Sequence, residues 1–397
     1  MYVKIKKKLK NLSEHGKIIV ITKKEGNTMS ENQKQTRPAF HGSDIEQIEK
    51  YYGIPKETII KFGANVNPLG LSASVRKAMA EHLDIITSYP DRDYKTLRQA
   101  IAGYCNTDIN YVVTGNGSTE LISLLITQRN ARHALVIGPT YSEYERELSL
   151  TGGRISNYNL EESQEFRIDL RHLEYALDDD VDFLILCNPN NPTSSALTCD
   201  ELDSLVKRCK ERKIFVMIDE TYVEFAPSID EISAVPLTAR YDNLMIIRGV
   251  SKFFAAPGLR LGYGITSNRA FLDNLTQRQN PWSLNSLGAF AGEIMLKDRD
   301  YISRTRELIL SERRKCLTVL EDYRYAKAYP AYGNFILVKI LKEGITSFDV
   351  FDHAIRQGMM IRDCSSFAGL SGEYVRFCIM MPKDNERLLH CLGELLA

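Results

Sequence analysis

Five short runs of apolar residues constrain the fold of this 397-residue chain more than any other feature. The runs span residues 111–114, 134–137, 183–187, 214–218 and 244–248. Stretches with helical periodicity follow two of these runs, at residues 119–127 and 199–212. A strand that faces water on one side alternates apolar and polar residues, whereas a strand covered on both faces is apolar throughout. The runs therefore predict an α/β fold whose mostly parallel sheet lies between helices.

Three of these runs end at loops that carry functional groups. The third precedes Asn188-Pro189-Asn190-Asn191-Pro192-Thr193, the fourth precedes Asp219, and the fifth ends just before Ser251-Lys252. Open α/β sheets bind ligands at the carboxyl ends of their strands. We therefore expect these loops to meet at one edge of the sheet, although they are far apart in the sequence.

Lys252 is the residue on which the functional interpretation depends. It lies in a mostly apolar stretch, and Arg260 follows among glycines. Such a lysine suits a Schiff base with pyridoxal 5′-phosphate (PLP), a cofactor that serves as an electron sink. Asp219 is costly to bury unpaired, and a protonated pyridine nitrogen would satisfy it. The alternative for Asp219 is an N-cap at the start of the next helix.

Other side chains can supply the remaining contacts that PLP needs. Tyr222 and Asn191 can donate hydrogen bonds to the ring oxygen, although a core tyrosine and an ordinary turn are the alternatives. Tyr141, near a strand end, can stack on the ring. The candidates for the phosphate are Gly117, Ser118, Thr119, Ser251 and Arg260. An ordinary helix N-cap is the alternative for the hydroxyl residues that open the helix.

Two arginines near the C-terminus are candidates for binding the substrate. Arg376 lies within an apolar strand, where an unpaired guanidinium would be hard to bury. An incoming carboxylate is a natural bidentate partner for it. Arg362 can bind a second anion or pair with Asp363. A structural salt bridge is the alternative for both arginines.

Composition excludes several classes of function. The chain has 51 basic and 51 acidic residues, so no net charge favours nucleic acid or an anionic membrane as partner. Its eight cysteines include no CxxC pair and no zinc-type spacing, so we expect no metal site. Free thiols within apolar runs are typical of a cytoplasmic protein.

The ends of the chain differ from its centre. Runs at residues 334–340 and 375–380 predict strands of a smaller α+β domain, with helices near 347–357 and 384–396. We expect residues 41–85 and 266–397 to form this smaller domain, and residues 86–265 to form the larger, PLP-binding domain. The first 28 residues hold eight lysines and two glutamates, and we expect residues 1–40 to be a disordered basic tail.

Taken together, these residues resemble a fold-type I PLP enzyme of the aminotransferase superfamily, from about His41 to the C-terminus. The resemblance rests on the ordered set Asn191, Asp219, Tyr222, Lys252, Arg260 and Arg376. It implies a mostly parallel seven-stranded sheet, with Lys252, Asp219 and Tyr222 as catalytic residues. The similarity is to threonine-phosphate decarboxylases first and to histidinol-phosphate aminotransferases next.

Four stretches resemble the decarboxylases more than the aminotransferases: residues 41–44, 62–70, 281–285 and 361–370. The resemblance implies a homodimer with shared active sites, in which Tyr89 reaches the cofactor phosphate of the partner subunit. It also implies that Arg376 holds the substrate carboxylate and that Arg362 lies near the substrate phosphate. The other implied substrate-binding residues are His41, Asn65, Asn67 and Trp282.

The resemblance implies decarboxylation of O-phospho-L-threonine to aminopropanol phosphate for the cobalamin side chain. Phosphoserine and related phospho- or phosphono-amino acids are close alternatives. Histidinol-phosphate:2-oxoglutarate transamination is the second reading, because the same residues serve both reactions. A non-catalytic PLP-binding module is the third, and it would leave the chemistry of Lys252 unused.

Overall fold

The computed structural model describes Phe40, Gly42 and residues 44–397. His41 and nearly all of the predicted tail lie outside the described residues. None of the helices between residues 44 and 397 combines the length and the apolar character needed to cross a membrane.

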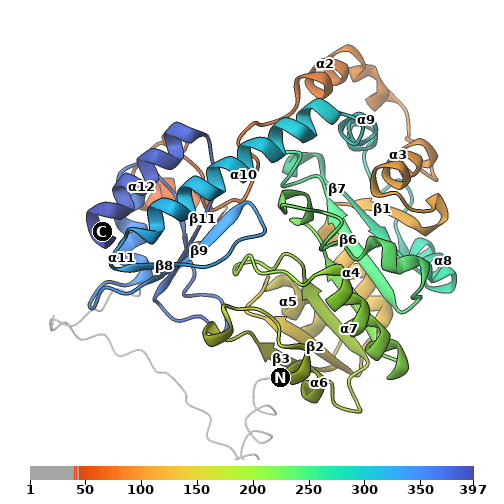
Figure 1. Cartoon of the computed structure of the whole chain (residues 1–397). Coiled ribbons are helices and arrows are strands. Elements are labelled where there is room, and N and C mark those ends of the chain that lie inside the picture. Colours follow the sequence, from red (N-terminus) through yellow and green to blue (C-terminus); the bar gives the residue numbers. More distant parts are fainter. Residues whose placement is uncertain (1–39, 41, 43) are drawn as a thin grey trace, which may run out of the picture. The chain divides into compact units, whose positions relative to one another are not determined.

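Seven strands form the larger sheet (Figure 1). They are β1 (Val112–Asn116), β2 (His133–Gly138), β3 (Arg154–Asn159), β4 (Phe183–Cys187), β5 (Phe215–Asp219), β6 (Leu244–Gly249) and β7 (Leu261–Ile265). Their spatial order is β1-β7-β6-β5-β4-β2-β3. The pairings from β3 across to β6 are all parallel, and β7 runs antiparallel to both of its neighbours. The predicted α/β fold with a mostly parallel seven-stranded sheet is confirmed.

The helices of this region cover the sheet with apolar stripes. α7 (Cys199–Glu211) begins at a capping box made by Thr198 and Glu201, which satisfies free amides of its first turn. Its buried residues, Leu202, Leu205, Val206 and Cys209, recur at helical spacing on one face. This amphipathic pattern explains why the stretch folds as a helix against a strand layer that is buried on both sides.

Strand β7 is absent from the predicted apolar runs because glycines interrupt it. Gly262 pairs with Gly249 of β6 on one side and with Gly115 of β1 on the other. A Cβ atom on Gly262 would lie 2.2 Å from the backbone nitrogen of Ser118. Glycine is therefore required because the start of α4 (Ser118–Arg129) packs directly on this strand.

A second, antiparallel sheet contains β8 (Ala326–Ala328), β9 (Phe335–Ile340), β10 (Arg362–Asp363) and β11 (Tyr374–Cys378). Its order is β10-β11-β9-β8. The accompanying helices are α10 (Arg299–Glu321), α11 (Ser347–Arg356) and α12 (Pro382–Leu396). The predicted smaller α+β layer is therefore present.

The expected domain limits stay a prediction. A bridge between Ile60 and Met359 joins the N-terminal part of the described chain to the segment that precedes β10. However, α9 (Ser286–Met295) packs on the larger sheet, since a Cβ on Gly292 would meet Leu261 of β7 and Leu97 of α3 (Lys95–Cys105).

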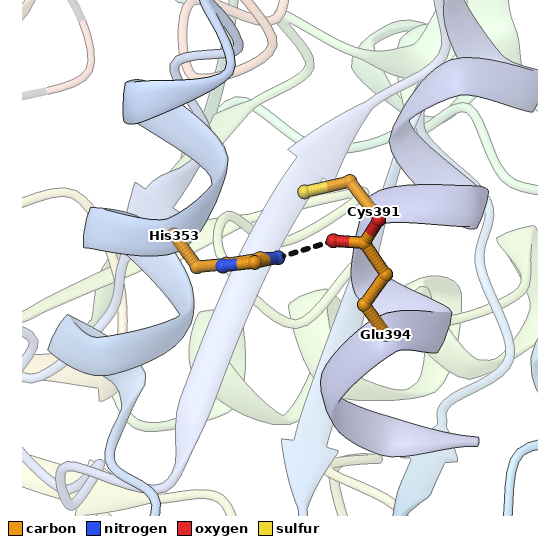
Figure 2. A group of neighbouring side chains, drawn as sticks. All are labelled: His353, Cys391 and Glu394. Carbon is orange, nitrogen blue, oxygen red and sulfur yellow. Dashed lines mark hydrogen bonds and ion pairs between the residues drawn. The ribbon is translucent and has the colours of Figure 1, made fainter.

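One polar contact joins α11 to α12. The His353 Nε2 and a carboxylate oxygen of Glu394 are 2.7 Å apart, with the thiol of Cys391 beside them (Figure 2). The ligand-capable atoms of these three residues lie within 4.8 Å of one another. Sequence spacing gave no sign of this group, because its members come from two helices.

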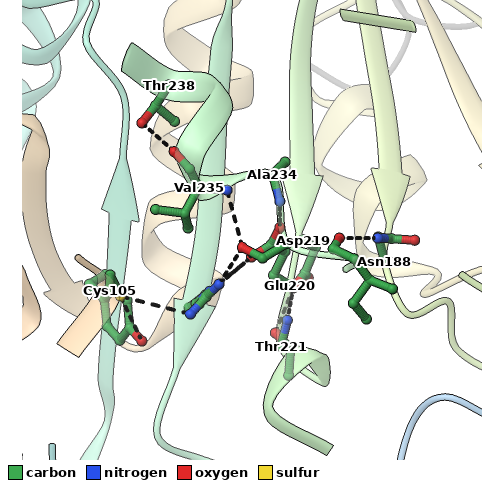
Figure 3. Close-up of polar contacts among 12 residues, drawn as sticks. Cys105, Asn188, Asp219, Glu220, Thr221, Ala234, Val235 and Thr238 are labelled. Atoms are coloured by element: carbon green, nitrogen blue, oxygen red, sulfur yellow. Dashed lines mark hydrogen bonds and ion pairs between the residues drawn. The ribbon is translucent and has the colours of Figure 1, made fainter. Parts of the chain in front are cut away.

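A buried ion pair lies behind the end of β5. Glu220 accepts two hydrogen bonds from the Arg248 guanidinium, at 2.9 and 2.6 Å, and both side chains are almost fully buried. Ala234 N donates to the other oxygen of Glu220 at 2.6 Å, and Ser233 hydroxyl lies between the two partners (Figure 3). The carboxylate therefore has its hydrogen bonds satisfied without water.

Removing one charge of this pair is expected to be costly. We predict that Glu220→Gln lowers the free energy of unfolding by about 3 kcal/mol, because it leaves the Arg248 charge buried and uncompensated. The double variant Glu220→Gln/Arg248→Met should recover part of that loss. Urea unfolding at neutral pH measures both, and a loss below about 1 kcal/mol for the single variant would contradict the prediction.

Candidate active site

A cavity of about 350 Å³ opens at the carboxyl ends of β4, β5 and β6. Its volume lies within the range of small-molecule sites. The structure brings most of the predicted site residues together around it, from both sheets. Those that line it are Asn65, Ser118, Thr119, Tyr141, Asn191, Asp219, Tyr222, Ser251, Lys252, Arg260, Arg362 and Arg376.

Asp219 ends β5 at the floor of this cavity. Its Oδ1 accepts hydrogen bonds from Thr221 N at 2.9 Å and from Thr221 Oγ1 at 2.6 Å, and its Oδ2 accepts one from Tyr144 at 2.6 Å. Burial raises the pKa of the carboxyl group despite these donors. A cation placed against Asp219 would remove that penalty. The protonated ring nitrogen of PLP is such a cation.

Lys252 faces the same cavity from the loop after β6. Its ammonium donates to the carbonyl oxygen of Ala64 at 2.7 Å. Burial first, and then the positive charge of Arg376, lower its pKa from 10.5 to about 8. A lysine with so low a pKa is neutral often enough to act as a nucleophile near neutral pH.

Asn191, Tyr222 and Asn65 form one wall. Asn191 Oδ1 accepts a hydrogen bond from Arg376, and Asn65 Nδ2 donates to the Tyr222 hydroxyl at 3.3 Å. The pKa of Tyr222 is raised by burial, so its hydroxyl stays protonated and can donate. Asn65 Oδ1 and Arg376 Nε are buried without a partner among the described residues. Such orphaned polar atoms at a cavity wall indicate a polar ligand.

The start of α4 lies at another side of the cavity. Gly117 precedes the helix with φ of 84°, and Ser118 and Thr119 supply its first amides. The Arg260 guanidinium crosses this turn, since a Cβ on Gly117 would lie 2.3 Å from one of its nitrogens. Free amides of a helix N-terminus beside an arginine and the Ser251 hydroxyl can hold a phosphate group.

Two guanidiniums lie side by side at the far end. Arg362 of β10 is the direct cross-strand partner of Arg376 of β11. Both are mostly buried, and Arg362 donates to Ser366 Oγ at 2.7 Å. The ion pairs among the described residues include neither arginine. Like charges directly opposite one another destabilise a sheet, so an anionic ligand would stabilise this pair.

These residues therefore fit PLP. The buried carboxylate, the low-pKa lysine, the helix N-terminus and the protonated Tyr222 hydroxyl supply one contact for each polar part of the cofactor.

The sequence matches the model of the aminotransferase class I and II family over residues 57–392. This chain belongs to that family.

Individual relatives agree with the family match. The threonine-phosphate decarboxylase of Salmonella typhimurium is 34% identical over 357 residues, which cover 90% of this chain and 96% of that protein. The structure of histidinol-phosphate aminotransferase from Clostridium acetobutylicum is similar with a TM-score of 0.79 and 32% identity, over 84% of this chain and 98% of that one.

A third relative shares the fold at lower sequence identity. Histidinol-phosphate aminotransferase from Sinorhizobium meliloti, solved in complex with PLP, shares the fold with a TM-score of 0.78 and 21% identity, over 92% of this chain and 98% of that one. The family membership and the similarity to the threonine-phosphate decarboxylase confirm the predicted PLP-dependent, decarboxylase-like enzyme.

Some of the residues predicted to form the site lie away from the cavity. Asn67 is buried, and its Nδ2 donates to Phe253 O, Tyr301 and Thr305 at 2.8–2.9 Å. Its backbone nitrogen also donates to Lys252 O at 3.0 Å. Asn67 thus supports the Lys252 loop, and the prediction that it binds substrate does not fit this placement.

Two aromatic residues lie at the surface instead. Tyr89 is 81% exposed, and its ring centroid is 4.9 Å from that of Trp282, which is 42% exposed. Neither lines the cavity of its own chain. The remaining predicted substrate residue, His41, lies outside the described residues.

Sequence reasoning missed several residues of the cavity. Tyr144 and Thr221, which hold Asp219, gave no signal beyond their polarity. Ser366 lay inside a recognised stretch but was not chosen. Asn157 and Asn159 line the cavity from β3, an edge strand whose polar residues hid it among the apolar runs.

The lowered pKa of Lys252 predicts a pH-dependent capture of the cofactor. Only the neutral amine attacks an aldehyde, so the rate of PLP capture by cofactor-free enzyme should rise with pH and level off above about 8. Visible absorbance of the lysine-bound cofactor gives the rate. Arg376→Gln removes a neighbouring charge and should move the midpoint upward. A wild-type midpoint near the ordinary value of 10.5 would contradict the assignment.

Proposed function

We propose that this protein decarboxylates O-phospho-L-threonine to (R)-1-amino-2-propanol phosphate, a step in making the cobalamin side chain. The observation that carries the proposal is the pair of guanidiniums, Arg376 and Arg362, on adjacent strands of one cavity wall, neither of which has a carboxylate partner among the described residues. A phospho-amino acid offers two anions, a carboxylate and a phosphate, to match them. The resemblance to threonine-phosphate decarboxylase over nearly the whole chain supports the same substrate class.

We infer the following roles for the site. Asp219 holds the protonated ring nitrogen, Tyr222 and Asn191 the ring oxygen, and Tyr141 the ring face. Arg376 binds the substrate carboxylate, and Arg362 binds the phosphate with Ser366. The cofactor phosphate is held by the residues described at the start of α4, together with Ser251 and Arg260.

When bound, PLP supplies a conjugated ring that accepts the electron pair of a bond broken at the substrate Cα. Lys252 would hold the cofactor through its amine, which is the nucleophile of the site. The two arginines then orient the substrate so that its carboxylate bond stands perpendicular to the ring. Lys252 in its ammonium form would donate the proton that replaces the lost carboxylate at Cα.

Histidinol-phosphate transamination is the second candidate. The similarity to the Clostridium acetobutylicum aminotransferase, at 32% identity and a TM-score of 0.79, favours it. The same residues serve both reactions, and the difference lies in which Cα bond the arginines hold perpendicular to the ring.

One assay separates the two candidates. We expect purified enzyme with PLP to release carbon dioxide from O-phospho-L-threonine without any 2-oxo acid acceptor. Lys252→Ala is the control, because it should lose this activity and the visible absorbance of the lysine-bound cofactor. Product formation only from histidinol phosphate, and only with 2-oxoglutarate present, would overturn the decarboxylase proposal. Activity unchanged in Lys252→Ala would contradict the catalytic assignment of the lysine.

We also propose a cytoplasmic homodimer with shared active sites. The exposed Tyr89–Trp282 pair supports this proposal, because large aromatic side chains at the surface are typical of interfaces. All eight cysteines are free, which agrees with a reducing compartment.

Subunit mixing tests the shared site. If Tyr89 completes the partner's site, a hybrid of Tyr89→Ala and Lys252→Ala subunits contains one intact site. Random mixing of the two variants should then recover up to about a quarter of wild-type activity. Activity no higher than the sum of the separate variants would place Tyr89 outside the partner's site.

A further inference from the structure

A carboxylate in the segment after β3 accepts hydrogen bonds from two residues of the smaller sheet and from Tyr329, which directly follows β8. Lys327 of β8 adds an ion pair to the same carboxylate at 3.6 Å. Glu162 begins η4 (Glu162–Gln164), just after β3. Its Oε1 accepts a hydrogen bond from the Tyr329 hydroxyl at 2.8 Å. Its Oε2 accepts one from Lys339 Nζ at 2.7 Å and one from the Tyr374 hydroxyl at 2.9 Å. Glu162, Tyr329, Lys339 and Tyr374 are called the Glu162 cluster below.

The loop that carries Glu162 is held in place by the buried ring of Phe166. Phe166 is 2% exposed, and its ring centroid is 5.0 Å from that of Tyr329 and 5.8 Å from that of Tyr374. Glu165 and Phe166 both have positive φ, 52° and 56°. Side chains other than glycine avoid this region, so the packing of Phe166 must hold the loop in place.

The cluster stays charged over the whole physiological range. The hydrogen bond from Lys339 is the main reason that the pKa of Glu162 falls to about 2. The folded-state pKa is lowered, so the stabilisation is present above the ordinary pKa and is lost only as pH falls through about 2. The cluster is therefore a fixed contact at neutral pH and does not act as a pH switch.

The cluster holds the strand that carries the substrate-site arginine. Tyr374 and Arg376 are two residues apart on β11, so their side chains project from the same face. Their Cα atoms are about 7 Å apart along an extended strand. Lys339 is the cross-strand partner of Tyr374, and Arg362 is that of Arg376.

None of the four cluster residues lines the cavity. They can therefore act on the cavity only through the chain segments that they hold, and β11 is the segment that carries Arg376. Backbone pairing on both sides makes this strand stiff, so a shift at Tyr374 reorients the Arg376 guanidinium.

Resting on the proposed function, we propose that Glu162 is a positioning residue that sets which Cα bond of the substrate breaks. It holds β11 so that Arg376 and Arg362 keep the bond from Cα to the carboxylate perpendicular to the cofactor ring.

Two outcomes compete at this point. In the first, the Cα–carboxylate bond breaks, carbon dioxide leaves, the electron pair stays behind, and a proton from Lys252 ends on Cα. In the second, the Cα–H bond breaks, and Lys252 moves that proton to the cofactor carbon that bears the nitrogen. One water then releases a 2-oxo acid and leaves the amino group on the cofactor. The ratio of 2-oxo acid to carbon dioxide therefore reports the substrate's orientation.

The first test is Glu162→Gln, which keeps the side chain's shape and removes its charge. We expect the ratio of 2-oxo acid to carbon dioxide from O-phospho-L-threonine to rise about tenfold. Glu165→Gln is the matched control, since Glu165 is an exposed glutamate three residues further along the same loop, and it should behave as wild type. Absorbance of the lysine-bound cofactor should be unchanged in both variants.

A second pair of variants separates positioning from general stability. Tyr374→Phe and Tyr329→Phe each remove one hydroxyl that donates to the Glu162 carboxylate. Both variants keep the ring that packs on Phe166. Only Tyr374 belongs to the arginine strand. We expect Tyr374→Phe to raise the ratio, and Tyr329→Phe to change it by less than about twofold. Equal effects would overturn transmission through β11.

A readout that does not need turnover completes the test. Hydrogen exchange of the amides of residues 374–378 should be faster in Glu162→Gln than in Glu165→Gln. An unchanged product ratio in Glu162→Gln, even with a lower melting temperature, would show a structural contact only and would overturn the proposal.

Failure of the proposed function is a separate outcome. In that case the wild type releases no carbon dioxide from any phospho-amino acid. The positioning role would then be supported only if Glu162→Gln both speeds amide hydrogen exchange in β11 and raises KM for the amino donor without loss of bound cofactor. If either change is missing, the positioning role is contradicted as well.

Discussion

The parallel register of β4, β5 and β6 is the constraint on which the site depends. Cys187 of β4 pairs with Asp219 of β5, and Asp219 pairs with Ile247 of β6, so these strands end at one level. The hydrogen bonds continue one residue further, from Asn188 N to Asp219 O and from Glu220 N to Ile247 O, each at 2.8 Å. The loops carrying Asn191, Asp219 and Lys252 therefore leave the sheet side by side.

Burial of charge at this edge gives the residues their chemistry. The same loss of water raises the pKa of Asp219 and lowers that of Lys252 to about 8. A structural charge one residue further on, Glu220, is neutralised by Arg248, whereas Asp219 has only neutral donors. The two adjacent carboxylates therefore have different roles. Glu220 forms a structural ion pair between neighbouring strands, whereas Asp219 can bind a cationic ligand.

The smaller sheet completes the site from the other side. Strands β10 and β11 of this sheet carry Arg362 and Arg376, which line the cavity. The Glu162 cluster joins the same sheet to the segment after β3. The Arg376 guanidinium also binds Asn191 and the Gly63 carbonyl, so three chain segments meet at one side chain. The position of the Arg376 guanidinium therefore depends on contacts with residues from distant parts of the chain.

The strands that could be predicted are those whose burial on both faces leaves a continuous apolar run, such as β4 and β6. β3 could not be predicted in this way because it is an edge strand with polar residues. β7 could not be predicted because glycines such as Gly262, which allows α4 to approach, interrupt its apolar run. Among site residues, Lys252 and Asp219 could be predicted because each is a charge at the end of an apolar run. Tyr144 could not, because its contact with Asp219 joins residues 75 positions apart.

The sequence by itself determined the sheet and the family and predicted the candidate cofactor-binding groups, since these follow from local patterns of apolar runs and charged loop residues. The tertiary structure decided which of those groups share a cavity. In the structure, Asn67 binds the backbone beside Lys252 instead of lining the cavity, and Tyr89 and Trp282 lie at the surface. It also set the low pKa of the lysine and the pairing of Arg362 with Arg376. The physical reason is that desolvation and cross-strand contact depend on residues distant in sequence, which no local pattern specifies.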